Sequence, residues 1–141
     1  ARGIMLLVKG DANAAKADLQ RAFDLEKTAD SAGDLFAALA RDGAGATTDM
    51  KRAADKVKTK AWPRKIVDLH MGTVPPEDVI AHARSSPSRT CEGLYHAALI
   101  LQVKGNKDAA LPLLKEVASD CYDFAFERWM AAADLRRLTI Q

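Results

Sequence analysis

The 141-residue chain has little of what several classes of protein require. No apolar run approaches the roughly 18 to 20 residues that span a bilayer as a helix, so the sequence predicts no transmembrane segment. β-Branched residues are sparse and alanine is abundant, which disfavours sheets and favours closely packed helices. The formal net charge is +2, too small to indicate nucleic acid or an anionic surface as a partner by itself.

The sequence also lacks the motifs of common catalytic and metal sites. The stretch DGAGA at residues 42–46 has neither the Lys nor the Ser/Thr of a phosphate-binding loop. The histidines form no HExxH pattern, and the serines of the Pro-containing loop lack the glycines of a nucleophile elbow. These residues are His70, His82 and His96, and Ser85, Ser86 and Ser88. We therefore expect no enzymatic activity, no bound metal and no cofactor.

Helix start and stop signals are present along the whole chain. Prolines suit first turns, glycines end helices, and Asp, Ser, Thr or Asn can cap the starts. Pro112 is expected to bend its helix, although the apolar spacing continues through it. The sequence predicts an all-α single domain over residues 1–141, with antiparallel hairpins at about 1–28, 30–60, 62–84 and 91–120 and a capping helix at 122–138. Residues 85–90 are expected to form a connection, and the fourth helix to extend to about Lys60.

Two segments 95 residues apart are alike, LLVKGDANAAKADL at 6–19 and LQVKGNKDAALPLL at 101–114. This offset is close to three times a repeat of roughly 32 to 34 residues, the length of a helical hairpin repeat. Residues 91–122 fit the tetratricopeptide (TPR) pattern in spacing, with small residues where the helices cross and large ones between them. The positions are Leu94, Ala97, Ala98 and Leu101, the turn at Gly105, then Ala110, Leu114 and Val117. We expect a TPR-like superhelix, a solenoid of such hairpins.

From Trp62 to Leu138 the order of elements resembles the NlpI-type TPR lipoproteins of Gram-negative bacteria. A tryptophan and an Ile-Val pair precede a helix-ending glycine, a short helix, a complete hairpin and a last helix with Glu127 and Leu135. The resemblance implies a non-enzymatic adaptor of the periplasm or cell envelope, which binds envelope proteases or peptidoglycan hydrolases. It also implies a lipid anchor as the membrane contact; the cysteine that would carry it near the start is not in the sequence, and we expect either a targeting segment or an anchor upstream.

Both cysteines lie at the edges of the predicted 91–120 hairpin. In an antiparallel hairpin the start of the first helix and the end of the second lie at the same end, so Cys91 and Cys121 can form a disulfide. A lasting disulfide requires an oxidising compartment such as the periplasm. The alternative is two unpaired thiols packed as small hydrophobic groups.

A TPR-like solenoid commonly binds partners on its concave face, lined by the first helix of each hairpin. On this alignment the face contains Val67, His70, Glu92, Tyr95, Leu99 and Gln102. An exposed tyrosine beside a leucine is typical of a peptide anchor, so Tyr95 is the leading candidate. Trp62 and Trp129 are expected in the core.

Two alternatives stand beside the adaptor. Residues 51–65 carry seven basic residues against one acidic residue, and could bind an anionic polymer, a nucleic acid or a glycan, although we do not expect nucleic acid as the main partner. The candidate residues are Lys51, Arg52, Lys56, Lys58, Lys60, Arg64 and Lys65. The other alternative is a structural, self-associating protein, through an apolar face formed by Met5, Leu6 and Val8.

Overall fold

The structure, a computed structural model, describes residues 2–41, 48–123 and 125–140. Within these residues there are helices and short connections and no strand, which confirms the all-α prediction. The DGAGA stretch lies outside the described residues. The chain divides into two compact units, Ala1–Pro75 (unit 1) and Pro76–Gln141 (unit 2), each described here by itself. The expected 62–84 hairpin is divided between them; a single domain and a superhelix both stay predictions.

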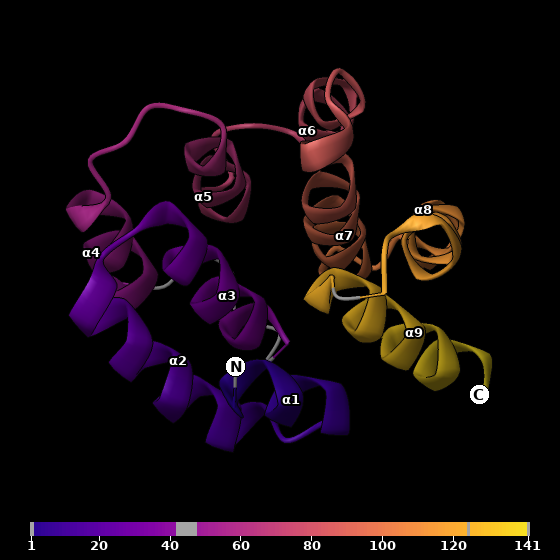
Figure 1. Cartoon of the computed structure of the whole chain (residues 1–141), viewed down its shortest axis with the longest axis horizontal. Helices are drawn as coiled ribbons and strands as arrows, with labels where there is room; N and C mark the ends of the chain where they lie inside the picture. The colour runs from indigo at the N-terminus through magenta and orange to yellow at the C-terminus, as the bar shows by residue number, and fades with distance from the viewer. Residues whose placement is uncertain (1, 42–47, 124, 141) are drawn as a thin grey trace. The chain divides into compact units, whose positions relative to one another are not determined.

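Unit 1 is built around an alanine-rich central helix. Its helices are α1 (Arg2–Lys9), α2 (Ala12–Glu26), α3 (Ala29–Ala40), α4 (Thr48–Lys56) and α5 (Pro63–Met71). α3 packs against α2, α4 and α5, while α1 packs on α2 (Figure 1). Ala32, Ala37 and Ala38 are fully buried beside Leu35 and Phe36. Small side chains let neighbouring helices approach closely, which explains how one short helix can contact three others.

The connections of unit 1 follow from local capping. Thr28 and Ser31 form a reciprocal capping box at the start of α3, and Lys27 takes the left-handed conformation that ends α2. α5 ends at Gly72, whose φ of 79° suits a residue without a side chain. α4 ends at Lys56 and not at Lys60 as predicted, because the chain tightens there: the Val57 N–H donates to the carbonyl of Ala54 at 3.1 Å.

Unit 2 contains four helices that pack in succession, α6 (Pro76–Arg84), α7 (Pro87–Val103), α8 (Lys107–Asp120) and α9 (Phe126–Thr139) (Figure 1). α7 also contacts α9, so it has neighbours on three sides. The α7–α8 hairpin agrees with the predicted spacing. Gly105 turns the chain with a φ of 82°, and the crossing and large positions Leu94, Ala97, Ala98, Ala110, Leu114 and Val117 are buried, whereas the large position Leu101 is half-buried.

Two boundaries of unit 2 differ from the prediction. α7 begins at Pro87, inside the expected 85–90 connection, because proline is favoured in the first turn, where no N–H is needed. α9 begins at Phe126, not at Tyr122. Pro112 lies inside α8, which runs continuously from Lys107 to Asp120, as its apolar spacing predicted.

Candidate functional sites

The six residues predicted to line a concave face are mostly buried. Val67 and Tyr95 have no exposed surface, Leu99 is 3% exposed and His70 is 5% exposed. Glu92 and Gln102 alone of the six are partly exposed. The prediction of an exposed Tyr95 is therefore wrong. Its physical reason is the packing of α7 among α6, α8 and α9, which leaves no open side where Tyr95 and Leu99 lie.

Tyr95 instead takes part in a buried polar network that joins α7 to α9. Its hydroxyl donates to Asp134 Oδ2 at 3.1 Å, and Arg137 Nη1 donates to Asp134 Oδ1 at 2.9 Å. The Asp134 side chain is 3% exposed, so a carboxylate inside unit 2 is balanced by a guanidinium and a hydroxyl. These contacts give Tyr95 a structural role.

A cluster of aromatic side chains is exposed around the start of α9. Phe126 is 38% exposed and Trp129 is 39% exposed, and their rings contact edge to face with centroids 5.8 Å apart. Tyr122, just before the helix, is 69% exposed. We call Tyr122, Phe126 and Trp129 the aromatic surface. Trp129 was predicted in the core; that is wrong, because Met130, Ala131 and Ala133 provide the buried face of α9 instead.

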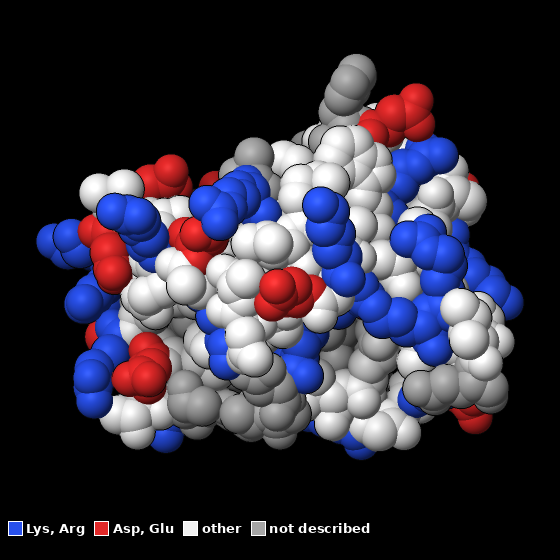
Figure 2. Space-filling view, turned by 90° about the horizontal axis from the view of Figure 1, so that it is seen from below, with Lys and Arg blue, Asp and Glu red and all other residues white. Residues whose placement is uncertain are grey.

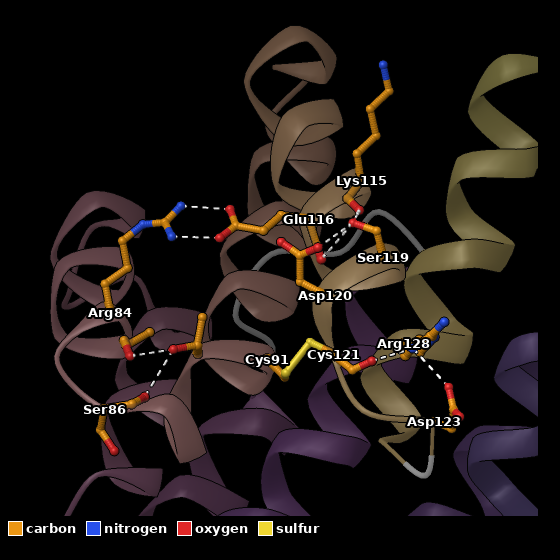
Figure 3. The surroundings of a disulfide bond; sticks show 12 residues. Arg84, Ser86, Cys91, Lys115, Glu116, Ser119, Asp120, Cys121, Asp123 and Arg128 are labelled. Carbon is orange, nitrogen blue, oxygen red and sulfur yellow. Dashed lines mark hydrogen bonds and ion pairs between the residues drawn. A yellow bond between two sulfur atoms is a disulfide. The ribbon is translucent and has the colours of Figure 1, made fainter.

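The start of α9 is held in place by the end of α8 and its disulfide. Cys91 of α7 and Cys121 after α8 are bonded, with Cα atoms 5.9 Å apart, as the hairpin geometry predicted (Figure 3). Arg128 donates to the carbonyl of Cys121 and pairs with Asp123 at 3.0 Å. The guanidinium of Arg128 therefore ties the helix that carries the aromatic surface to the disulfide itself.

A second link near the disulfide joins α6 to α8. The two guanidinium nitrogens of Arg84 reach the two carboxylate oxygens of Glu116 at 2.7 and 2.8 Å, and Figure 3 shows the pair facing each other. This hydrogen-bonded pairing lowers the pKa of Glu116 and raises the pKa of Arg84. The pair stands beside a cavity of about 290 Å³ whose wall includes the disulfide.

The basic segment is only partly available to a ligand. Lys51, Arg52 and three further lysines, Lys56, Lys58 and Lys60, are exposed, whereas Arg64 and Lys65 are half-buried. Arg64 donates to the carbonyls of Val57 at 2.9 Å and Ala54 at 3.2 Å, and its Nε pairs with Asp68 at 3.0 Å. Arg64 thus caps the end of α4. Figure 2 shows basic side chains spread across the displayed face with acidic ones among them.

The apolar residues predicted to mediate self-association, Met5, Leu6 and Val8, do not form one exposed face of α1. Met5 of α1 is 38% exposed, while Leu6 and Val8 are half-buried and their neighbours Ile4 and Leu7 are in the core. Gly3 lies close to α2: a Cβ there would meet Leu19 Cγ at 2.7 Å. The apolar residues of α1 are therefore used largely for packing on α2.

Other chemistry is limited in the described part of the chain. No group of three or more His, Cys, Asp or Glu side chains there could hold a metal ion. His70 and His96 are buried, and the ring of each contacts an aromatic neighbour, Phe36 and Tyr95 respectively. Among the described helices, none is both long and apolar enough to cross a membrane.

The fold and these sites define an all-helical protein of packed helices and hairpins, with one disulfide-linked hairpin, an exposed aromatic surface and a lysine-rich segment. Searches against protein-family models, curated proteins and solved structures found no match to the chain.

Proposed function

We propose that this protein is a non-enzymatic adaptor with a TPR-like arrangement of helical hairpins, and that it binds partner proteins through the aromatic surface of unit 2. The observation that carries the proposal is the exposure of Tyr122, Phe126 and Trp129 within eight residues of sequence. The occupant we propose is a segment of a partner protein that presents apolar side chains.

Exposed aromatic residues suit this role for energetic reasons. Tyrosine and tryptophan are enriched among the residues that dominate binding energies, because a large rigid ring buries much apolar area at low cost in side-chain entropy. Trp129 is already oriented by Phe126 and by the helix that Arg128 fixes to Cys121. A preorganised surface loses less entropy when a partner docks, which favours binding.

The proposal places the protein in the periplasm or cell envelope of a Gram-negative bacterium. A lasting Cys91–Cys121 bond requires an oxidising compartment, and the resemblance to envelope TPR lipoproteins favours the same location. Envelope proteases or peptidoglycan hydrolases are the partners that this resemblance suggests.

The proposal is tested by capture from a native envelope extract, followed by calorimetry between purified proteins. The test variant is Phe126→Ala/Trp129→Ala, and the control is Leu25→Ala/Ile140→Ala, which truncates two apolar side chains that are 81% and 82% exposed. We expect the test variant to lose a partner that the wild type and the control both retain, with affinity about 30-fold weaker or more, as for loss of 2 kcal/mol.

Equal capture by the test variant and the wild type would contradict the proposal. Sedimentation equilibrium distinguishes a further outcome: a molar mass that rises with concentration in the wild type and not in the test variant would assign the aromatic surface to self-association and would likewise overturn the adaptor function.

A second candidate function is the binding of an anionic polymer by the basic segment. The specific observation in its favour is that five of its seven predicted basic residues are exposed. We expect such binding to a glycan or nucleic-acid fragment to weaken steeply with added salt and to be lost in Lys51→Gln/Arg52→Gln/Lys60→Gln. Salt-independent binding, or equal binding by this variant, would contradict this candidate.

A further inference from the structure

Unit 1 contains an open cavity of about 600 Å³ between the start of α3 and the chain that follows α4. Its lining comes from residues 27–30 on one side and from residues 56–59, 61 and 63 on the other. The volume lies within the range of roughly 300 to 1,000 Å³ that is common for small-molecule sites. The cavity is distinct from the aromatic surface, which belongs to unit 2.

Three lysines give this cavity a positive charge. Lys27, Lys56 and Lys58 all line it and all are exposed, against one carboxylate, Asp30. Among the described residues, none of these three lysines forms an ion pair with a carboxylate. We call this site the lysine cavity.

The positive charge comes from the side chains and not from the helix end. The first turn of α3 is already capped, since the Thr28 hydroxyl accepts from the Ser31 N–H at 3.1 Å and the Ser31 hydroxyl accepts from the Thr28 N–H at 3.2 Å. A ligand would therefore be attracted mainly by the ammonium groups of Lys27, Lys56 and Lys58.

The rest of the lining is largely apolar. Ala61 is exposed and Pro63, in the first turn of α5, is half-buried, while Ala29 and Val57 behind them belong to the core, with 3% and 4% exposed surface. Arg64 holds the position of Val57 through its carbonyl, at 2.9 Å, so the wall is anchored to α5. An apolar wall next to ammonium groups suits a molecule with an apolar body and an anionic group.

We propose that the lysine cavity binds a small organic phosphate with an apolar body. Lysine is a common phosphate-binding residue, because its compact ammonium pairs with phosphate oxygens from several directions. Ala61 and Pro63 contact the apolar body in this arrangement. The proposal concerns a small molecule and is independent of the adaptor function in unit 2.

The first test uses phenyl phosphate as the probe, with phenol and inorganic phosphate as the two partial ligands. Binding is followed by amide shifts of the ¹⁵N-labelled full chain. We expect phenyl phosphate to bind with a Kd of about 1 mM or tighter. Phenol and inorganic phosphate should each bind at least about tenfold more weakly. The shifted amides should belong to residues 27–30 and 56–62. No saturable binding, or shifts elsewhere, would overturn the proposal.

Matched variants separate the cavity from general charge. Lys27→Gln/Lys56→Gln/Lys58→Gln removes the cavity lysines, and Lys104→Gln/Lys107→Gln/Lys115→Gln removes three exposed lysines of unit 2 that belong neither to the cavity nor to the basic segment. We expect affinity for phenyl phosphate to fall about tenfold or more in the first variant and less than about twofold in the second. Equal losses would assign binding to net charge and overturn the site.

A substitution of opposite sign completes the test. Asp30→Asn removes the single carboxylate of the lining, so we expect phenyl phosphate to bind about twofold to fivefold more tightly. Circular dichroism checks that each variant keeps the wild-type helix content. Unchanged or weaker binding by folded Asp30→Asn would contradict a phosphate seated beside that carboxylate.

Discussion

Units 1 and 2 are similar in size and both helical, but they are held together by different means. Unit 2 has a covalent link between α7 and α8, a guanidinium–carboxylate pair between α6 and α8, and a buried hydrogen-bonded carboxylate between α7 and α9. Unit 1 contains neither cysteine of the chain and relies on the alanine-rich α3 and on Arg64 at the end of α4. Among the described residues, the disulfide and the buried carboxylate that link helices both belong to unit 2, whereas the corresponding links named for unit 1 are Arg64 and the packing of α3.

The largest loss of stability should come from removing the disulfide, and it should affect unit 2 and not unit 1. Removing the bond with Cys91→Ser/Cys121→Ser frees a loop whose ends are 30 residues apart, which costs about 3 to 4 kcal/mol in the chain-entropy model. We expect hydrogen exchange to lose protection in α7 and α8 and to keep it in α2 and α3. Reductant should produce the same change in the wild type and none in the variant.

Equal loss of protection in both units would contradict the comparison, because it would show that they unfold together. Free thiols in the unreduced protein would contradict the bond itself and, with it, the argument for an oxidising compartment.

The next effect should come from the buried network of unit 2. Tyr95→Phe keeps the ring but removes the donor to Asp134, leaving a buried carboxylate with one partner fewer. We expect the free energy of unfolding to fall by about 1 to 3 kcal/mol. Tyr122→Phe is the control, because Tyr122 is 69% exposed and should change stability by less than about 0.5 kcal/mol. Urea denaturation of both variants measures the difference. Equal losses of stability would show that the Tyr95 hydroxyl does not stabilise unit 2.

In unit 1 the corresponding test is Arg64→Lys. Lysine keeps the charge but loses the fork that donates to the Ala54 and Val57 carbonyls. We expect a loss of about 1 to 2 kcal/mol, together with faster exchange at the end of α4. Lys60→Arg is the control and should be neutral, because Lys60 is exposed. If Arg64→Lys leaves the free energy of unfolding unchanged, Arg64 does not stabilise the end of α4 and would again be a candidate for binding anions.

The sequence predicted best what depends on local spacing. The small and large positions of the α7–α8 hairpin, from Leu94 to Val117, and the meeting of Cys91 with Cys121 follow from helix geometry within about 30 residues. The class of fold was also predictable, because caps, glycines and prolines are local signals.

The candidate site was predicted poorly because burial depends on distant neighbours. The repeat pattern treats α7 as a helix with an open side, but α9 covers Tyr95, and its contact Asp134 is 39 residues away. The exposure of Trp129 was missed for the same reason. The sequence of a helix does not decide by itself which of its apolar side chains the neighbouring helices cover. A polar signal was present, however: Asp134 and Arg137 stand one helical turn apart in α9 and can pair.

The smallest effect should come from the Arg84–Glu116 pair, and its pH dependence has a defined sign. Because Arg84 lowers the pKa of Glu116 in the folded state, the pair contributes stability that is fully present above the ordinary pKa of glutamate and is lost as the pH falls through the lowered folded value. The side chains are 48% and 31% exposed, so we expect Glu116→Gln to cost no more than about 1 kcal/mol at pH 7. A double-mutant cycle with Arg84→Gln, measured at pH 7 and again well below the ordinary glutamate pKa, should show a coupling energy that disappears in acid. A coupling of several kcal/mol, or one that grows in acid, would mean that unit 2 depends on this surface link more than on its disulfide and buried network.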